Sequence, residues 1–240
     1  MKKIKERLDS YLEFDSSDLF SIKIPYGFSG SPLIRIFGGA IRDSICGDKI
    51  NDIDILVGSN SIKELEKVII SNGYQYHRGL HTKDLSSIYD MSVISDPHTF
   101  INKNHKVIQL IRPRFKNVKD HSSYKAEYDN YQMIYHKLLS NVDISCCGVS
   151  YDGKDLYENY EGAIQHCLYK LYDVNSGAMM YNDKRISHRI AKLEERGWER
   201  ADKVNLRDRK IGIVLENKEN IEFKMEYFCD AIVSGDSDWC

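Results

Sequence analysis

Residues 33–57 read LIRIFGGAIRDSICGDKINDIDILV, and the order of apolar and polar residues in this stretch decides the fold. The apolar run at its start predicts a strand that ends at Gly38 and Gly39. A short helix is expected over 40–46, and a second strand is expected over 53–57. Alternation of strands and helices is typical of a sheet with helices packed against it.

Asp52 and Asp54 are separated by one residue, so on a strand they point to the same face. Two like charges held that close cost energy unless a cation lies between them, and a divalent metal is the usual cation. Gly38 and Gly39 expose backbone N–H groups at a helix start, where an anion such as a triphosphate is favoured. Arg42 adds a fork-shaped donor for phosphate oxygens.

The pattern GGxxRD from Gly38, followed by DxD from Asp52, resembles the head domain of class II tRNA nucleotidyltransferases (CCA-adding enzymes) and bacterial poly(A) polymerases, in the polymerase beta superfamily. The resemblance covers about residues 30–60. It implies an α+β fold in which a mixed sheet is flanked by helices, with a short helical C-terminal segment. It also implies metal-dependent transfer of an NMP from an NTP to a hydroxyl, with an RNA 3′ end as the acceptor.

In this reading Asp52 and Asp54 are the catalytic residues and hold Mg²⁺ or Mn²⁺. Gly38, Gly39 and Arg42 bind the phosphates of the NTP, which is the substrate.

The resemblance is less complete over residues 107–114. Arg114 falls where the family has a nucleotide-binding arginine, but Gln109 falls where the family has a third acid. An amide carries no negative charge to a metal. Either Asp90 or Asp96 supplies the third acid, or catalysis is weakened.

Residues 141–152 resemble the family's Arg-Arg-Asp-Phe-Thr strand and its Tyr-Asp turn. Asp143 is retained, but the two arginines, which in the family meet the triphosphate and the acceptor RNA, are Asn141 and Val142. This departure puts tRNA as the acceptor in doubt.

An amphipathic helix is expected over 183–196, ending at Gly197. By resemblance, Asp183 and Arg185 read the edge of the incoming base, although Asp183 is equally suited to cap the helix. Four further basic residues are candidates for RNA binding, unless they simply face solvent: Lys184, Arg189, Lys192 and Arg196.

The 240 residues divide into an expected head domain over 1–153 and a truncated helical segment with an acidic tail over 154–240. Within these, a strand is expected over 143–149 and a helix over 157–173. No apolar run reaches bilayer length and the six cysteines form no Cys-x-x-Cys pair, so we expect a cytoplasmic protein without a membrane partner, carrying free thiols. The sequence does not predict an oligomeric state.

Two other functions fit the sequence. The short chain and the missing arginines favour a transferase of the toxin or resistance type that modifies a small molecule, a protein or a tRNA. Gln109 favours a descendant that binds nucleotide or RNA without catalysis.

Overall fold

The computed structural model describes residues 1–22, 34–58, 61–77, 97–112, 139, 142–175, 183–203 and 223–225, and for 183–185 and 223–225 it describes the backbone alone. In this part of the chain, eight strands form one sheet and two form a separate ladder. The strands are β1 (Ile34–Phe37), β2 (Asp52–Val57), β3 (Tyr74–Tyr76), β4 (His98–Asn102), β5 (Val107–Ile111), β6 (Val149–Tyr151), β7 (Leu156–Glu158), β8 (Leu171–Tyr172), β9 (Glu199–Arg200) and β10 (Phe223–Met225).

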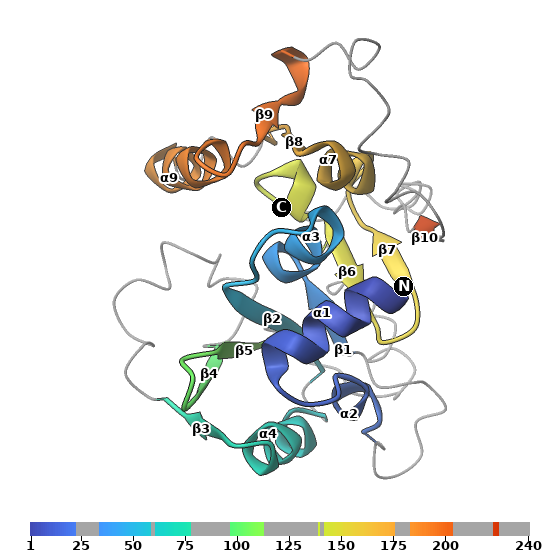
Figure 1. Ribbon diagram of the computed structural model, residues 1–240, viewed down its shortest axis with the longest axis vertical. Helices are drawn as coiled ribbons and strands as arrows, with labels where there is room; N and C mark the ends of the chain where they lie inside the picture. Colours follow the sequence, from blue (N-terminus) through green and yellow to red (C-terminus); the bar gives the residue numbers. More distant parts are fainter. Residues whose placement is uncertain are drawn as a thin grey trace, which may run out of the picture.

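The helices lie around this sheet (Figure 1). The α-helices are α1 (Lys2–Leu12), α2 (Ser17–Phe20), α3 (Gly39–Cys46), α4 (Ile62–Ser71), α7 (Ala163–Tyr169) and α9 (Asp183–Glu194), and the 3₁₀ helices are η2 (Ser145–Cys147) and η3 (Ala201–Lys203). The predicted α+β fold, a mixed sheet flanked by helices, is confirmed.

The large sheet has the strand order β10-β7-β6-β1-β2-β5-β4-β3. The pairs β2–β5 and β7–β10 are parallel, and the other pairs of this sheet are antiparallel. Strands β7 and β10, which both follow residue 153, therefore belong to the same sheet as β1 and β2.

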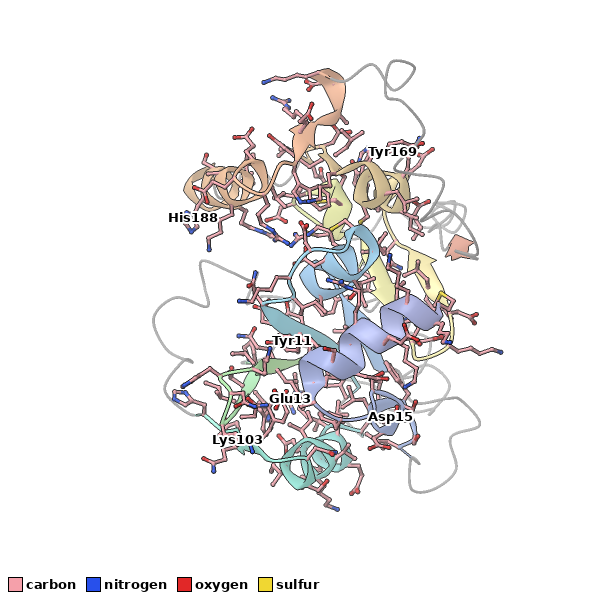
Figure 2. The ribbon with its side chains drawn as sticks, viewed as in Figure 1. Tyr11, Glu13, Asp15, Lys103, Tyr169 and His188 are labelled. Carbon is pink, nitrogen blue, oxygen red and sulfur yellow. The ribbon has the colours of Figure 1, made fainter. Side chains whose placement is uncertain are left out.

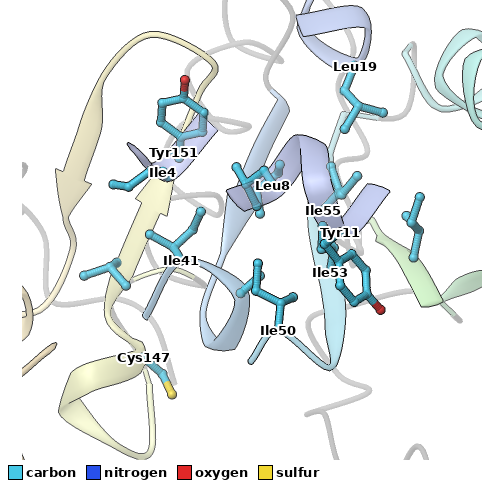
Figure 3. Packing of buried hydrophobic residues seen from close by; sticks show 14 of the residues in the cluster. Ile4, Leu8, Tyr11, Leu19, Ile41, Ile50, Ile53, Ile55, Cys147 and Tyr151 are labelled. Carbon is cyan, nitrogen blue, oxygen red and sulfur yellow. The ribbon is translucent and has the colours of Figure 1, made fainter. Parts of the chain in front are cut away.

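One face of the sheet is covered by α1 and α3 (Figures 1 and 3). Leu8 of α1 and Ile41 of α3 pack with Ile53 and Ile55 of β2, and all four are fully buried. Burial of a large aliphatic side chain stabilises the fold by about 1.5–3 kcal/mol. Because successive side chains on a strand alternate, burying Ile53 and Ile55 directs the neighbouring aspartates of β2 to the opposite face.

The segments after β5 differ from the expectation. Within the strand expected over 143–149, residues 145–147 instead form the 3₁₀ turn η2, and Val149 begins β6. The N–H of Cys147 donates to the carbonyl of Ile144 at 3.0 Å, and the buried Ser145 hydroxyl accepts the N–H of Asp173. The helix expected over 157–173 begins only at Ala163, since residues 156–158 pair with β6 as a strand.

Helices α7 and α9 and strands β8 and β9 gather at one end of the molecule (Figure 1). Figure 2 shows Tyr169 at the end of α7 and His188 on α9 on this end, far from Lys103 and Asp15. The helix expected over 183–196 is confirmed as α9, with Ile186 and Leu193 buried and Gly197 at a φ of 79° after its end. Among the described helices, none is long and apolar enough to cross a membrane.

Candidate functional site

The two aspartates of the DxD pattern begin β2. Asp52 is exposed and Asp54 is half-buried, whereas Ile53 between them is completely buried in the core. The carboxylates therefore share the face of the sheet that α1 and α3 do not cover. Their placement on a paired strand fixes their spacing, which is what a site for a cation needs.

The glycine turn lies directly beside these carboxylates. Phe37 is the antiparallel partner of Asp54, and the chain leaves β1 at the next residue, Gly38. Gly38 has φ 69° and ψ −129°, a conformation that side-chain-bearing residues rarely adopt. Its N–H donates to the carbonyl of Val149 and its own carbonyl accepts the N–H of Arg42, each at 3.0 Å. The turn thus starts α3 and brings the positive end of its dipole next to Asp54.

Arg42 lies one turn into α3 and is buried. Its Nε donates to Asp43 Oδ1 at 2.7 Å, its Nη1 donates to Cys147 Sγ at 3.3 Å, and its guanidinium lies 5.5 Å from the centre of the Trp198 ring. Burial alone would lower the pKa of Arg42, but Cys147 and Asp43 raise it well above its ordinary value. The group is therefore a permanent positive charge behind the glycine turn.

The remaining Arg42 nitrogen, Nη2, faces the turn itself. A Cβ placed on Gly39 would lie 3.5 Å from Nη2, so the guanidinium lies close over the backbone at the start of α3. From this position the guanidinium can donate to an anion that lies at the N-terminus of α3.

Two residues of α9 add positive charge from the other side. Asp52 is exposed to solvent, but protein on the sides of its carboxylate partly desolvates it, and this together with the negative charge of Asp43 raises the pKa of Asp52. The positive charges of Arg42, Arg189 and Lys192 oppose this shift. Arg42 of α3 and Arg189 of α9, which the sequence predicted separately, both contact the sulfur of Cys147, at 3.3 and 3.5 Å.

Arg189 is anchored by two contacts to residues at and just before η2. Its Nη1 donates to the carboxylate of Asp143, and its Nη2 donates to Cys147 Sγ at 3.5 Å. Cys147 thus accepts hydrogen bonds from both Arg42 and Arg189, a role that the expectation of ordinary free, buried thiols did not include. A hydrogen bond with Cys146 and the charges of the two arginines lower the pKa of the Cys147 thiol, although burial opposes this.

The other predicted residues are placed as follows. Gln109 lies on β5 as the parallel register partner of Asp54. Asp183, Lys184 and Arg185 form the first turn of α9, which the structure describes as backbone. Arg114, Asp90, Asp96 and Asn141 lie outside the described residues.

Arg196 lies in the turn that follows α9, and its guanidinium is directed inward. Its Nη2 lies 2.9 Å from Asp43 Oδ1 and 3.2 Å from Asp48 Oδ2. Asp43 belongs to α3 and Asp48 to the connection between α3 and β2, so Arg196 links the end of α9 to this part of the chain. Sequence reasoning singled out Arg196 for RNA and did not consider Asp48.

Three groups that bind metals in other proteins converge near Arg196. Ligand atoms of Asp43, Cys46 and Asp48 lie within 4.8 Å of one another. Both carboxylates are already paired with cations, and burial raises the pKa of Cys46 to about 11, so the thiol is neutral. Three positive side chains, Arg42, Lys170 and Arg196, face the two carboxylates, so a divalent cation would be repelled. The group is an ion-pair cluster and does not fit a metal centre.

Comparisons with known proteins give structural matches only. No family model matches the chain, and no curated protein matches its sequence. A CCA-adding enzyme in an apo form matches with a TM-score of 0.47 and 18% identity, over 77% of this chain and 38% of that one. The Thermotoga maritima CCA-adding enzyme complexed with tRNA matches with a TM-score of 0.41 and 15% identity, over 78% and 37%.

A tRNA nucleotidyltransferase complexed with a primer tRNA and an incoming ATP analogue also matches, with a TM-score of 0.44 and 14% identity, over 77% of this chain and 46% of that one. These structures are of the enzyme class that the GGxxRD and DxD patterns resemble. The chain spans less than half of the length of each of these three enzymes.

Proposed function

We propose that this protein is a nucleotidyltransferase that moves an NMP from an NTP to a hydroxyl acceptor. The observation that carries the proposal is the placement of Asp52 and Asp54 on one face of β2, directly beside the Gly38–Gly39 turn that starts α3. A paired carboxylate site next to a helix N-terminus suits a metal-bound triphosphate.

In this proposal Asp52 and Asp54 hold Mg²⁺ or Mn²⁺. Two carboxylates are the oxygen donors that these ions prefer, and mutual repulsion between the acids is relieved by a cation. When bound, the ion supplies Lewis-acid activation of the acceptor hydroxyl and neutralises charge on the phosphates.

The nucleotide-binding residues complete the site. The first-turn N–H groups of α3, which have no acceptor inside the helix, bind phosphate oxygens behind Gly38 and Gly39. Arg42 stabilises this anion from behind the turn, and Arg189 and Lys192 approach it from α9. Electrostatic stabilisation of this type is often the largest contribution to catalysis.

An RNA 3′ end is the proposed acceptor, based on the motif resemblance. Lys192 is exposed on α9 and available to a phosphate backbone, with Lys184 in the same helix. The proposed base-reading pair, Asp183 and Arg185, lies on the first turn of α9, and Arg114 remains a proposed nucleotide contact. The two domains, 1–153 and 154–240, remain a proposal.

One observation favours a second function. Gln109 is next to Asp54 in the sheet, where the motif resemblance expects an acid. A protein with two carboxylates at this site would still bind a metal-bound nucleotide, but it would transfer poorly or not at all. The alternative is therefore a nucleotide- or RNA-binding protein without catalytic activity.

A transfer assay separates the two functions. Each α-³²P-labelled NTP is incubated with the protein, Mg²⁺ or Mn²⁺ and bulk RNA, and label in acid-precipitable RNA is measured. The proposal expects incorporation with at least one NTP and its loss in Asp52→Asn and Asp54→Asn. Asp18→Asn, an exposed acid on α2, is the matched control and should keep wild-type incorporation. Nucleotide binding without any incorporation would support the second function.

A further inference from the structure

Asp48, in the connection between α3 and β2, contacts three residues from far along the chain. Its Oδ1 accepts a hydrogen bond from Lys170 Nζ at 2.7 Å. Its Oδ2 accepts one from Arg196 Nη2 at 3.2 Å and one from Trp198 Nε1 at 3.3 Å. One carboxylate on the head therefore holds both the end of α7 and the end of α9.

The three partners of Asp48 form a single unit. Strands β8 and β9 pair in parallel, and the N–H of Glu199 donates to the carbonyl of Lys170 at 2.9 Å. Lys170 Nζ also donates to the carbonyl of Arg196 at 3.3 Å. Because these residues are bound to one another, Asp48 holds the whole β8–β9 ladder.

Asp43 of α3 strengthens the same attachment. It shares Arg196 with Asp48 and is itself paired with Arg42, whose guanidinium lies over the ring of Trp198. Trp198 is 2% exposed, so the attachment is closed to solvent at its centre. Burial raises the pKa of Asp48, but hydrogen bonds from Lys170 and Trp198 outweigh this and lower it, which keeps the carboxylate charged.

The attachment lies just beyond the C-terminal end of α9. Arg189 and Lys192 are one to two turns before Arg196, and Arg189 donates to Cys147 Sγ, which also accepts a hydrogen bond from Arg42 behind the glycine turn. A helix held at this end has its last turns fixed relative to β2. Arg189 has its own contacts with Asp143 and Cys147, so loss of the attachment would release mainly the last turn of α9, which carries Lys192, and would leave these contacts to hold Arg189 alone.

We infer that Asp48 is a positioning residue: its carboxylate docks the β8–β9 ladder and the end of α9 on the connection between α3 and β2, so that α9 keeps Arg189 beside Cys147 and Arg42 and holds Lys192 in place. The catalytic consequence rests on the proposed function, whereas the docking itself does not. Asp48 touches no proposed substrate atom and acts through the positively charged residues of α9.

The test uses the full chain with Trp239→Phe, which leaves Trp198 as the only tryptophan, in combination with Asp48→Asn and Asp48→Glu. Hydrogen exchange of α9 and the emission wavelength of Trp198 report docking, and NMP-transfer kinetics report positioning. With Asp48→Asn we expect faster exchange in α9 but not in α1 or β2, and a red shift of the Trp198 emission. We also expect a fall in kcat/KM on the order of tenfold to a hundredfold, mainly through KM for the NTP. Asp48→Glu should restore part of both.

Arg196→Gln removes the same contact from the other side and serves if Asp48→Asn folds poorly. The double variant should then disturb docking by less than the sum of the two single variants, because both remove the contact between Asp48 and Arg196 while their contacts with Lys170, Trp198 and Asp43 are separate. Unchanged exchange and emission in Asp48→Asn would overturn the docking. Altered docking with unchanged kcat/KM would overturn the positioning role. If the wild type transfers no NMP, the proposed function fails, while exchange and emission still decide whether Asp48 docks α9.

Discussion

Asp54 on β2 and Gln109 on β5 are register partners in a parallel strand pair, so their side chains project from the same face of the sheet next to each other. Gln109 is paired on its other side with Thr99 of β4, which fixes its position. An amide offers neutral oxygen and N–H groups, and it cannot supply charge to a cation. Position 109 is therefore the place where a third carboxylate would join Asp52 and Asp54.

Gln109→Glu should raise the affinity of the proposed site for Mg²⁺. The change keeps the side-chain length and adds a negative charge a few ångströms from Asp54, which contributes about 1–4 kcal/mol of attraction to a cation. We expect the Mg²⁺ concentration for half-maximal transfer or nucleotide binding to fall on the order of tenfold. Gln75→Glu, an exposed glutamine on β3, is the matched control. An unchanged Mg²⁺ titration would show that position 109 does not face the metal.

Mg²⁺ and an NTP together should raise the melting temperature. A ligand that binds only the folded state stabilises it by about 2.7 kcal/mol at a hundredfold excess over its Kd, which for a protein of this size corresponds to roughly 5–11 °C. Differential scanning fluorimetry with each NTP, with and without Mg²⁺, measures the shift. Asp52→Asn and Asp54→Asn should lose the Mg²⁺-dependent part. No shift with any NTP and either Mg²⁺ or Mn²⁺ would argue against a nucleotide site at the glycine turn.

Gly38→Ala should destabilise the fold more than Gly39→Ala. No atom lies within 4 Å of a Cβ at Gly38, so the cost there comes from its φ of 69°, about 1–3 kcal/mol of backbone strain. A Cβ at Gly39 meets Arg42 Nη2 at 3.5 Å, an ordinary contact, and the backbone there is helical. Chemical denaturation of both variants measures the difference. Equal stability of the two would show that the turn relaxes to another conformation.

The sequence predicted those parts of the site that depend on local pattern. The two strands around the glycine turn and the shared face of Asp52 and Asp54 follow from residues close in the chain. The role of Asp48 does not, because its partners Lys170 and Trp198 are 122 and 150 residues further on. The basic residues of α9 likewise predict an RNA contact for Arg196, but its guanidinium is paired with Asp43 and Asp48.

Long-range pairing also explains the differences in secondary structure. Residues 156–158 form β7 because β6 offers a strand edge for pairing. The helix of this segment, α7, begins only at Ala163. The 3₁₀ turn at Ser145 depends on a hydrogen bond with Asp173 and on the contact between its hydroxyl and His166 Nδ1 at 2.6 Å. Such contacts override local propensity. The strand prediction over 143–149 is based on local propensity alone.

The stability contribution of Asp48 should depend on pH. Its pKa in the folded protein is lowered from the ordinary value of 3.8, so the unfolded chain binds a proton first as the pH falls. The stabilisation is therefore fully present above the unfolded pKa and is lost as the pH falls through the folded pKa. The difference in unfolding free energy between wild type and Asp48→Asn should be constant between about pH 7 and 5 and shrink below about pH 4. Urea denaturation across this range measures it, and a difference that grows on acidification would contradict the charged state of Asp48.

RNA binding should separate Lys192 from Arg196. Each phosphate contact releases counterions, so Lys192→Gln should lower the slope of log K against log[salt] by about one. Arg196 is bound to Asp43 and Asp48, so Arg196→Gln should leave this slope unchanged. The wild type should also fail to rebuild a truncated tRNA CCA end efficiently, because Asn141 and Val142 lack the guanidinium forks expected there. Filter binding of a short RNA at several salt concentrations and a CCA-addition assay measure these outcomes. A reduced slope in Arg196→Gln would assign Arg196 to RNA, and robust CCA addition would show that the two arginines are dispensable.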